Sequence, residues 1–136
     1  MTANKAFILG YTLENKAYKK EKESIIFDDF TLEAKFVNFP YMVKSSAIKI
    51  LTLRSKVEDN LRFNYELLNN TKFNMLGHAR HYISVVQPEE VYTAKKNEQD
   101  EIAKLFTNID NLITLHQRKL EKLKNIKKSL LEKMFV

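Results

Sequence analysis

The sequence predicts an α+β protein: a small, mainly β head over residues 1–96, followed by one long C-terminal helix over residues 97–136. Two observations predict this division. Short apolar segments of strand length alternate with polar and turn-forming residues between positions 24 and 86. From Asn97 onward the chain contains no glycine or proline, and apolar residues recur at steps of three and four. We therefore expect a globular domain and, after it, a coiled-coil helix.

Three segments in the first part of the head are predicted to be strands. Residues 24–30, SIIFDDF, form a buried apolar run that ends in two acids. Residues 33–39, EAKFVNF, alternate apolar and polar side chains and are closed by Pro40. Residues 47–53, AIKILTL, have apolar side chains on both faces, which is typical of a buried strand.

A short helix and a last strand are predicted in the second part of the head. Residues 59–70, DNLRFNYELLNN, have helical periodicity, and either Asp59 or Asn60 can cap the first turn. The pair Asn69-Asn70 can end this helix. Residues 82–86, YISVV, are rich in β-branched side chains and are expected to form a strand.

The C-terminal helix carries apolar residues close to heptad spacing, which we call the seam. A helix with such a seam needs a partner, because it cannot bury its apolar stripe alone. At about 1.5 Å per residue the helix would be roughly 55–60 Å long, too long to be buried in a small globule. Thr93 or Asn97 is expected to cap it. The seam comprises Ile102, Leu105, Ile109, Leu112, His116, Leu120, Leu123, Ile126, Leu130 and Met134.

Composition excludes several classes of protein. The chain is 44% hydrophobic with fifteen Tyr and Phe residues, so a packed core is expected. Cysteine is absent, which excludes disulfides and thiolate metal sites and fits a reducing cytoplasm. No apolar run reaches eighteen residues, and the N-terminus lacks the pattern of a signal peptide. We therefore expect a cytoplasmic protein with no membrane partner.

The net charge of +6 suggests a polyanion or an acidic protein as partner. The head has fifteen basic and eleven acidic side chains, and the C-terminal helix has eight basic and six acidic. Seven of the basic residues lie between Arg118 and Lys133. The alternative interpretation is a solvated lysine face that keeps the helix soluble.

No motif for catalysis or for a cofactor is present. Phosphate-binding glycine loops, the nucleophile elbow and the HExxH zinc motif are all absent. His78 and His81 have an HxxH spacing but lack an evident third ligand. His116 on the seam is better explained as a residue that sets helix register or pairs with a polar neighbour. Asp28 and Asp29 would point to opposite faces of a strand, so a strand-end turn or a polar pair beside a binding face is favoured over cation binding. We expect no cofactor, no metal and no catalytic residue.

Two polar loops of the head could contact DNA. Residues 72–82, KFNMLGHARHY, combine donor-rich side chains with Gly77, which permits close backbone approach. The segment around residues 43–49 adds ammonium and hydroxyl groups. Polar surface loops are common, so composition alone does not decide the point. The candidate DNA-binding residues are Lys44, Ser45, Ser46, Lys49, Lys72, His78, Arg80, His81 and Tyr82.

Three parts of the C-terminal helix carry a family resemblance. They are Glu98-Gln99 with Ile102, the segment Ile109-Asp110-Asn111-Leu112-Ile113, and the run from His116-Gln117-Arg118 to Met134-Phe135. This pattern resembles the conserved helical region that ends the DNA-specificity (S) subunit of type I restriction-modification systems. Upstream, IIFDDFTLEAKFVNFPYMVKSSAIKIL and GHARHYISVVQP resemble one variety of the target-recognition domain of that family.

The resemblance implies a specific role. Such subunits usually carry two target-recognition domains, each reading half of a bipartite DNA sequence, and two conserved helices that pack antiparallel. The helices dock methyltransferase (M) subunits, through which the restriction (R) subunit joins, and the S subunit is not an enzyme. This chain has one recognition unit and one helix, so it resembles the C-terminal half of such a subunit. The resemblance also implies a head that is truncated at its N-terminus.

Two hypotheses arise from the resemblance. In the first, the chain is a half-subunit that binds double-stranded DNA through the two loops, docks M subunits, and pairs with itself or another S subunit. In the second, it is an assembly adaptor that pairs through its helix and modulates specificity without reading DNA. A stand-alone enzyme is disfavoured by the missing motifs. The residues expected at the helix interface are Ile109, Leu112, His116, Leu120, Leu123, Ile126, Leu130 and Met134.

Overall fold

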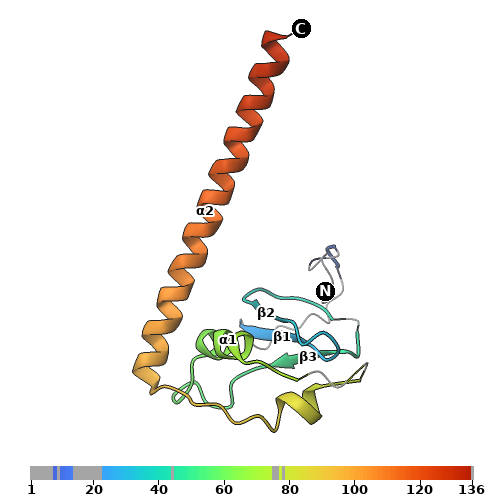
Figure 1. Cartoon of the computed structure of the whole chain (residues 1–136), viewed down its shortest axis with the longest axis vertical. Coiled ribbons are helices and arrows are strands. Elements are labelled where there is room, and N and C mark those ends of the chain that lie inside the picture. Colours follow the sequence, from blue (N-terminus) through green and yellow to red (C-terminus); the bar gives the residue numbers. More distant parts are fainter. Residues whose placement is uncertain are drawn as a thin grey trace. The chain divides into compact units, whose positions relative to one another are not determined.

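The computed structural model describes residues 8, 10–13, 23–43, 45–74, 77 and 79–135. The chain divides into two compact units, Met1–Gln99 and Asp100–Val136. Figure 1 shows the elements along the chain. In order, they are the strands β1 (Ser24–Asp28), β2 (Ala34–Val37) and β3 (Ile48–Leu51), the helix α1 (Leu61–Asn70), a single π-helical turn η1 (Tyr82–Val86), and the helix α2 (Lys96–Met134). The predicted α+β class, a small sheet followed by a long C-terminal helix, is confirmed.

The three strands form an antiparallel sheet in the order β2-β1-β3. The central strand β1 contributes Ile25, Ile26 and Phe27, all of them buried. Branched and aromatic side chains are favoured in such a strand because both of its faces are covered. The three predicted strands are therefore confirmed, each shorter than the segment from which it was predicted.

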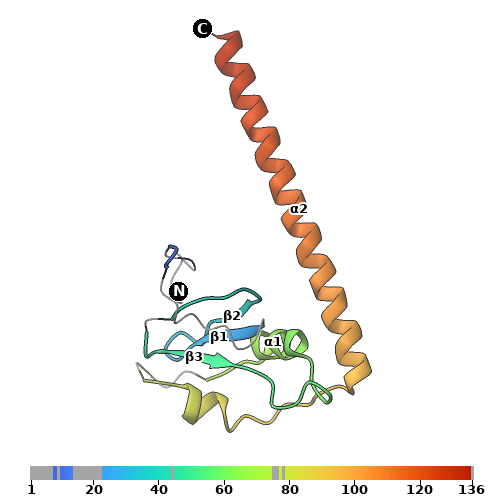
Figure 2. The same ribbon diagram turned by 180° about the vertical axis from the view of Figure 1, so that it is seen from behind.

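The two faces of the sheet bury different sets of side chains. On one face, Ile26 packs with Val37, Tyr41 and Ile48. The Tyr41 hydroxyl lies 2.7 Å from the Ser24 hydroxyl and satisfies both groups where they are buried. On the opposite face, α1 packs against β2 and β1, as the view in Figure 2 also shows. The sheet is therefore a central layer with covering segments on both sides.

Of the two N-cap residues that the sequence allows for α1, Asp59 and Asn60, the structure uses Asn60. The Asn60 side chain accepts a hydrogen bond from the Phe63 N–H at 3.1 Å. The Arg62 guanidinium lies over the rings of Phe36 and Tyr65, at 5.4 and 5.1 Å from their centroids. Phe36 belongs to β2, so this cation–π contact joins the helix to the sheet.

Residues 82–86 are not a strand, contrary to the prediction. They form the π-helical turn η1, in which the Val86 N–H donates to the His81 carbonyl and the Gln87 N–H donates to the Tyr82 carbonyl. The Tyr82 ring packs against Phe27, with 5.8 Å between ring centroids. Tertiary packing of Tyr82 thus outweighs the β propensity of Ile83 and its neighbours.

The beginning of α2 also differs from the prediction. The helix starts at Lys96, so Asn97 lies within its first turn and Thr93 lies upstream of the cap position. The buried Gln99 side chain fixes this turn. Its Oε1 accepts from the Asn60 N–H at 2.8 Å, and its Nε2 donates to Thr93 Oγ1 at 3.2 Å and to the Ala94 carbonyl at 2.9 Å. Thr93 therefore contributes through Gln99 rather than as a cap.

Candidate nucleic-acid interface

Two loops of the N-terminal unit meet at Asp29, immediately after β1. The Asp29 N–H donates to the Ala47 carbonyl, and the Asp29 carbonyl accepts from the His81 N–H, each at 2.9 Å. Its carboxylate accepts from the Tyr82 N–H at 2.7 Å and lies 3.5 Å from the Lys49 ammonium. Asp29 is only 2% exposed. One buried residue therefore contacts both loops that were predicted to contact DNA.

Arg80 is the exposed cation of this cluster. Its guanidinium donates to the carbonyl of Ser46 at 3.4 Å and to the Ser46 hydroxyl at 3.3 Å, and it lies 5.8 Å from the centre of the Phe30 ring. The Asp28 carboxylate accepts from the N–H groups of Phe30 and Thr31 at 2.8 and 2.9 Å and so forms the turn that presents Phe30. The predicted strand-end turn is therefore found at Asp28.

The structure gathers five of the nine predicted DNA-binding residues into one cluster, which we call the loop cluster. Ser45 and Ser46 form the turn before β3, and the Ser45 hydroxyl accepts from the Ala47 N–H at 3.2 Å. Bonds from Asp29 and Arg80 connect this turn to the second loop. The five residues are Ser45, Ser46, Lys49, Arg80 and Tyr82.

The other four predicted residues are not part of the loop cluster as the structure describes it. Lys72 is exposed, and Lys44 and His78 lie outside the described residues. His81 is only 1% exposed, with its ring Nδ1 3.4 Å from the Asp29 carbonyl oxygen. A side chain so deeply buried packs against the protein rather than facing a ligand. His81 therefore packs within the protein in this structure, and its contact with DNA stays a prediction.

The charges of the loop cluster largely compensate one another. Lys49 is paired with Asp29, and the Asp28 carboxylate is engaged by two backbone N–H groups. The ionised side chains of the cluster are Asp28, Asp29, Lys49 and Arg80. Of these, Arg80 is exposed, and its described contacts are all to neutral groups. The cluster can therefore bind one or two phosphates through a guanidinium and hydroxyls, but it is not a broadly basic surface.

The sequence singles out Asp29 only as one member of the Asp28-Asp29 pair, and it does not single out Phe30. The Asp28-Asp29 pair was visible as a polar end to a strand, and that was the available signal. The role of Asp29 depends on Ala47, Lys49, His81 and Tyr82, which are remote from it in sequence. Within the part of the chain that the structure describes, no three His, Cys, Asp or Glu side chains are grouped to hold a metal ion.

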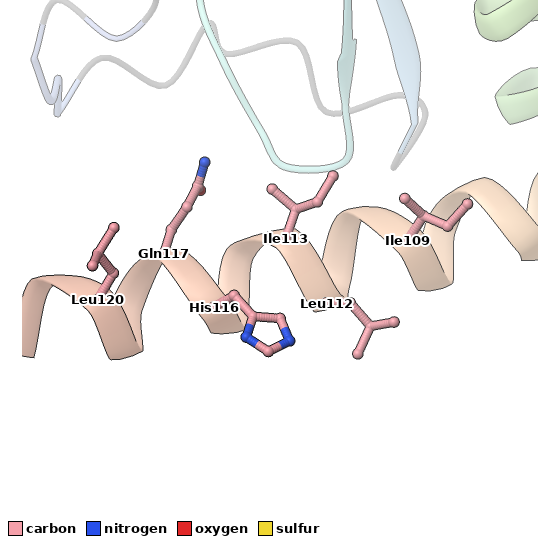
Figure 3. A pocket seen from close by; sticks show the side chains of 6 residues that line it. All are labelled: Ile109, Leu112, Ile113, His116, Gln117 and Leu120. Carbon is pink, nitrogen blue, oxygen red and sulfur yellow. The ribbon is translucent and has the colours of Figure 1, made fainter.

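The second candidate surface is the apolar side of α2. Figure 3 shows Leu112 and His116 at one margin of this side, with Ile113 and Gln117 at the other. Leu112 and Ile113 are 56% and 48% exposed. Ile113, with Phe106 and Leu131, makes the apolar surface wider than the predicted seam. The seam residues Ile109, Leu112, His116, Leu120, Leu123, Ile126, Leu130 and Met134 are all exposed.

No described helix has the length and apolar character needed to cross a membrane. The exposed apolar residues of α2 are interspersed with lysines and acids along the same helix.

Comparison with known proteins gives one informative match. The chain is 42% identical over 88 residues to the type I restriction enzyme EcoR124I/EcoR124II specificity subunit of Escherichia coli. The matched region covers 62% of this chain and 22% of the relative, so the chain spans about a fifth of that protein's length. No family model and no solved structure matches. The chain is therefore similar to a type I restriction enzyme specificity subunit, the family that the sequence resembles.

Proposed function

We propose that this chain is a non-catalytic DNA-specificity component of a type I restriction-modification system. In this proposal it acts as a half-subunit: residues 1–96 read one half of a bipartite site, and residues 97–136 form the helix for pairing and methyltransferase docking. The 42% identity to a specificity subunit carries the proposal. The joining of two predicted DNA-contact loops at Asp29 supports it, because a reader needs its contact groups on one surface.

The proposed DNA contact is centred on Arg80. Its guanidinium binds a phosphate, and the hydroxyls of Ser45 and Ser46 supply further donors to the backbone. The two described hydrogen bonds to Ser46 use two of the five N–H groups of a guanidinium, so a phosphate can be bound without breaking them. Lys72, Lys44 and His78 remain proposed contacts from the same two loops.

The proposed partner surface is the apolar side of α2. It pairs with the α2 of a second copy or of another specificity subunit, and it docks M subunits, through which the R subunit joins. Its apolar positions include Phe106 and Ile113 beside the seam, and a wide apolar face is typical of a helix with more than one neighbour. Such a helix can take part in pairing and docking together.

Replacing Arg80 with alanine should weaken binding to duplex DNA about tenfold, because one charge-assisted phosphate contact is lost. Fluorescence anisotropy with a labelled duplex, repeated over a range of salt concentrations, measures the effect. The slope of log K against log salt should fall in magnitude by about 0.9, the value for one phosphate. The matched control is Arg54→Ala.

Arg54 suits this control because it follows β3 at the end of the sheet opposite the loop cluster, and it is also exposed. Its replacement removes the same charge, so a non-specific effect of net charge would appear in both variants. Equal losses in Arg80→Ala and Arg54→Ala would contradict a contact at the loop cluster.

The adaptor hypothesis remains the second candidate, and the charge compensation within the loop cluster favours it. An adaptor held by the apolar side of α2 would bind its partner almost independently of salt, whereas a DNA reader loses affinity steeply with salt. Sedimentation of the chain alone, with duplex DNA, and with a type I M subunit separates the two. A dimer that binds both supports the half-subunit; binding to the M subunit without DNA supports the adaptor.

A further inference from the structure

We infer that Asp29 is a positioning residue, whose buried carboxylate holds Arg80 ready for a DNA phosphate. This inference rests on the proposed function. It concerns a residue that does not touch DNA itself. Asp29 would act through the two loops of the loop cluster by fixing them to each other and to the end of β1.

The contacts of the Asp29 carboxylate explain why a charge is retained in this buried place. A carboxylate that is 2% exposed is costly unless it is paired and hydrogen-bonded. One oxygen of Asp29 accepts from the Tyr82 N–H, and the other lies against the Lys49 ammonium. Each oxygen thus engages a different loop, so the buried charge joins two segments that are separate in sequence.

The side chain of Asp29 repeats two connections that its backbone already makes. The backbone is bonded to Ala47 in the first loop and to His81 in the second. The carboxylate contacts Lys49 in the first loop and Tyr82 in the second. Removing the side chain would leave each loop with one bond to residue 29 instead of two. Greater mobility of the loops is therefore expected, without loss of the sheet.

Arg80 is the group that would respond to this mobility. Arg80 contacts Ser46 and Phe30. Each of these three residues is next in the chain to Asp29 or to a residue that is hydrogen-bonded to Asp29. Ser46 precedes Ala47, Arg80 precedes His81, and Phe30 comes directly after Asp29 in the chain. Arg80 and Ser46 are 34 residues apart, so their contact depends on the loops being held together. A preorganised guanidinium binds a phosphate with a smaller loss of conformational entropy.

Two substitutions of Asp29 should have different effects on DNA binding. Asp29→Ala removes both oxygens and should weaken binding to a labelled mixed-sequence duplex about three- to tenfold. The reason is that the side chains of the loosened loops must then lose conformational entropy when DNA binds. Asp29→Asn keeps a carbonyl oxygen for the Tyr82 N–H and frees the Lys49 ammonium. Because it loses only the link to the first loop, its affinity should fall less than that of Asp29→Ala.

Electrostatics alone predicts another pattern. Both substitutions remove a negative charge near the proposed phosphate, so both would strengthen binding to a similar degree. The matched control is Asp28→Asn, which removes a charge one residue away and keeps an acceptor for the turn at Phe30. If Asp29→Ala binds as tightly as Asp28→Asn, the inference is overturned.

A double-mutant cycle shows whether Asp29 acts through Arg80. If it does, Asp29→Ala should cause little further loss in a chain that already carries Arg80→Ala. Fully additive losses would mean that Asp29 affects DNA binding by another route and would overturn the inference. Each variant is first shown to be fully folded at the temperature of the titration, so that a lower affinity cannot result from a smaller folded fraction.

Hydrogen exchange gives a readout that does not depend on DNA. In Asp29→Ala the Tyr82 amide loses its acceptor, so the amides of residues 80–82 should exchange faster while those of Ile26 in β1 stay protected. Unchanged exchange at residues 80–82 would overturn the inference. If the unchanged chain fails to bind duplex DNA, the proposed function fails, and the exchange data still decide whether Asp29 holds the loops together.

Discussion

Replacing Leu123 with glutamate is expected to prevent self-association of the chain through α2. Leu123 is 54% exposed on the apolar side of the helix, where it would be buried in a helix pair. Losing a buried leucine from each chain costs about 3–6 kcal/mol per dimer, and burying the introduced carboxylate adds to that cost. The dissociation constant should therefore rise by more than about a hundredfold. Sedimentation equilibrium measures the change.

Asn125→Glu is the matched control for this prediction. Residues 123 and 125 lie on nearly opposite sides of a helix, because each residue advances the direction by about 100°. Both variants gain one negative charge in the same turn, and both are exposed positions of α2. Asn125→Glu should therefore sediment as the unchanged chain does. A Leu123→Glu chain that still forms a dimer would show that the seam is not the pairing surface.

Local sequence signals predicted most of the fold. The strands β1 to β3 are predicted by short branched and aromatic runs. The helix α1 is predicted by its periodicity and by two candidate caps, Asp59 and Asn60, of which the structure uses Asn60. The absence of glycine and proline in the last forty residues predicted the continuous helix α2. These properties are encoded within a few neighbouring residues, so a single sequence reveals them.

Interactions between distant residues account for the features that the sequence did not reveal. The turn η1 replaces a predicted strand because the Tyr82 ring packs on Phe27 and the Tyr82 N–H is bound by Asp29. The burial of His81 has the same origin, since its N–H donates to the Asp29 carbonyl. The polarity of the two loops was visible in the sequence. Their meeting at Asp29 was not, because loop geometry is set by tertiary packing.

Replacing Phe27 with alanine is expected to unfold the N-terminal unit while leaving α2 helical. Phe27 has no exposed surface, and its ring packs against that of Tyr82. Truncating a buried phenylalanine costs about 3–5 kcal/mol, a large part of the roughly 5–15 kcal/mol that stabilises a typical domain. The control is Ile83→Ala, because Ile83 lies beside Tyr82 but is 73% exposed. Its effect should be within about 0.5 kcal/mol.

Two spectroscopic signals distinguish the units. Near-ultraviolet circular dichroism and tyrosine fluorescence report the N-terminal unit, where all six tyrosines lie, whereas the far-ultraviolet helix signal comes mainly from the 39 residues of α2. Phe27→Ala should lose the first signal and retain most of the second when α2 is paired. Equal loss of both would show that α2 depends on the N-terminal unit. A chain that retains self-association but loses DNA binding would assign the two proposed activities to separate parts of the molecule.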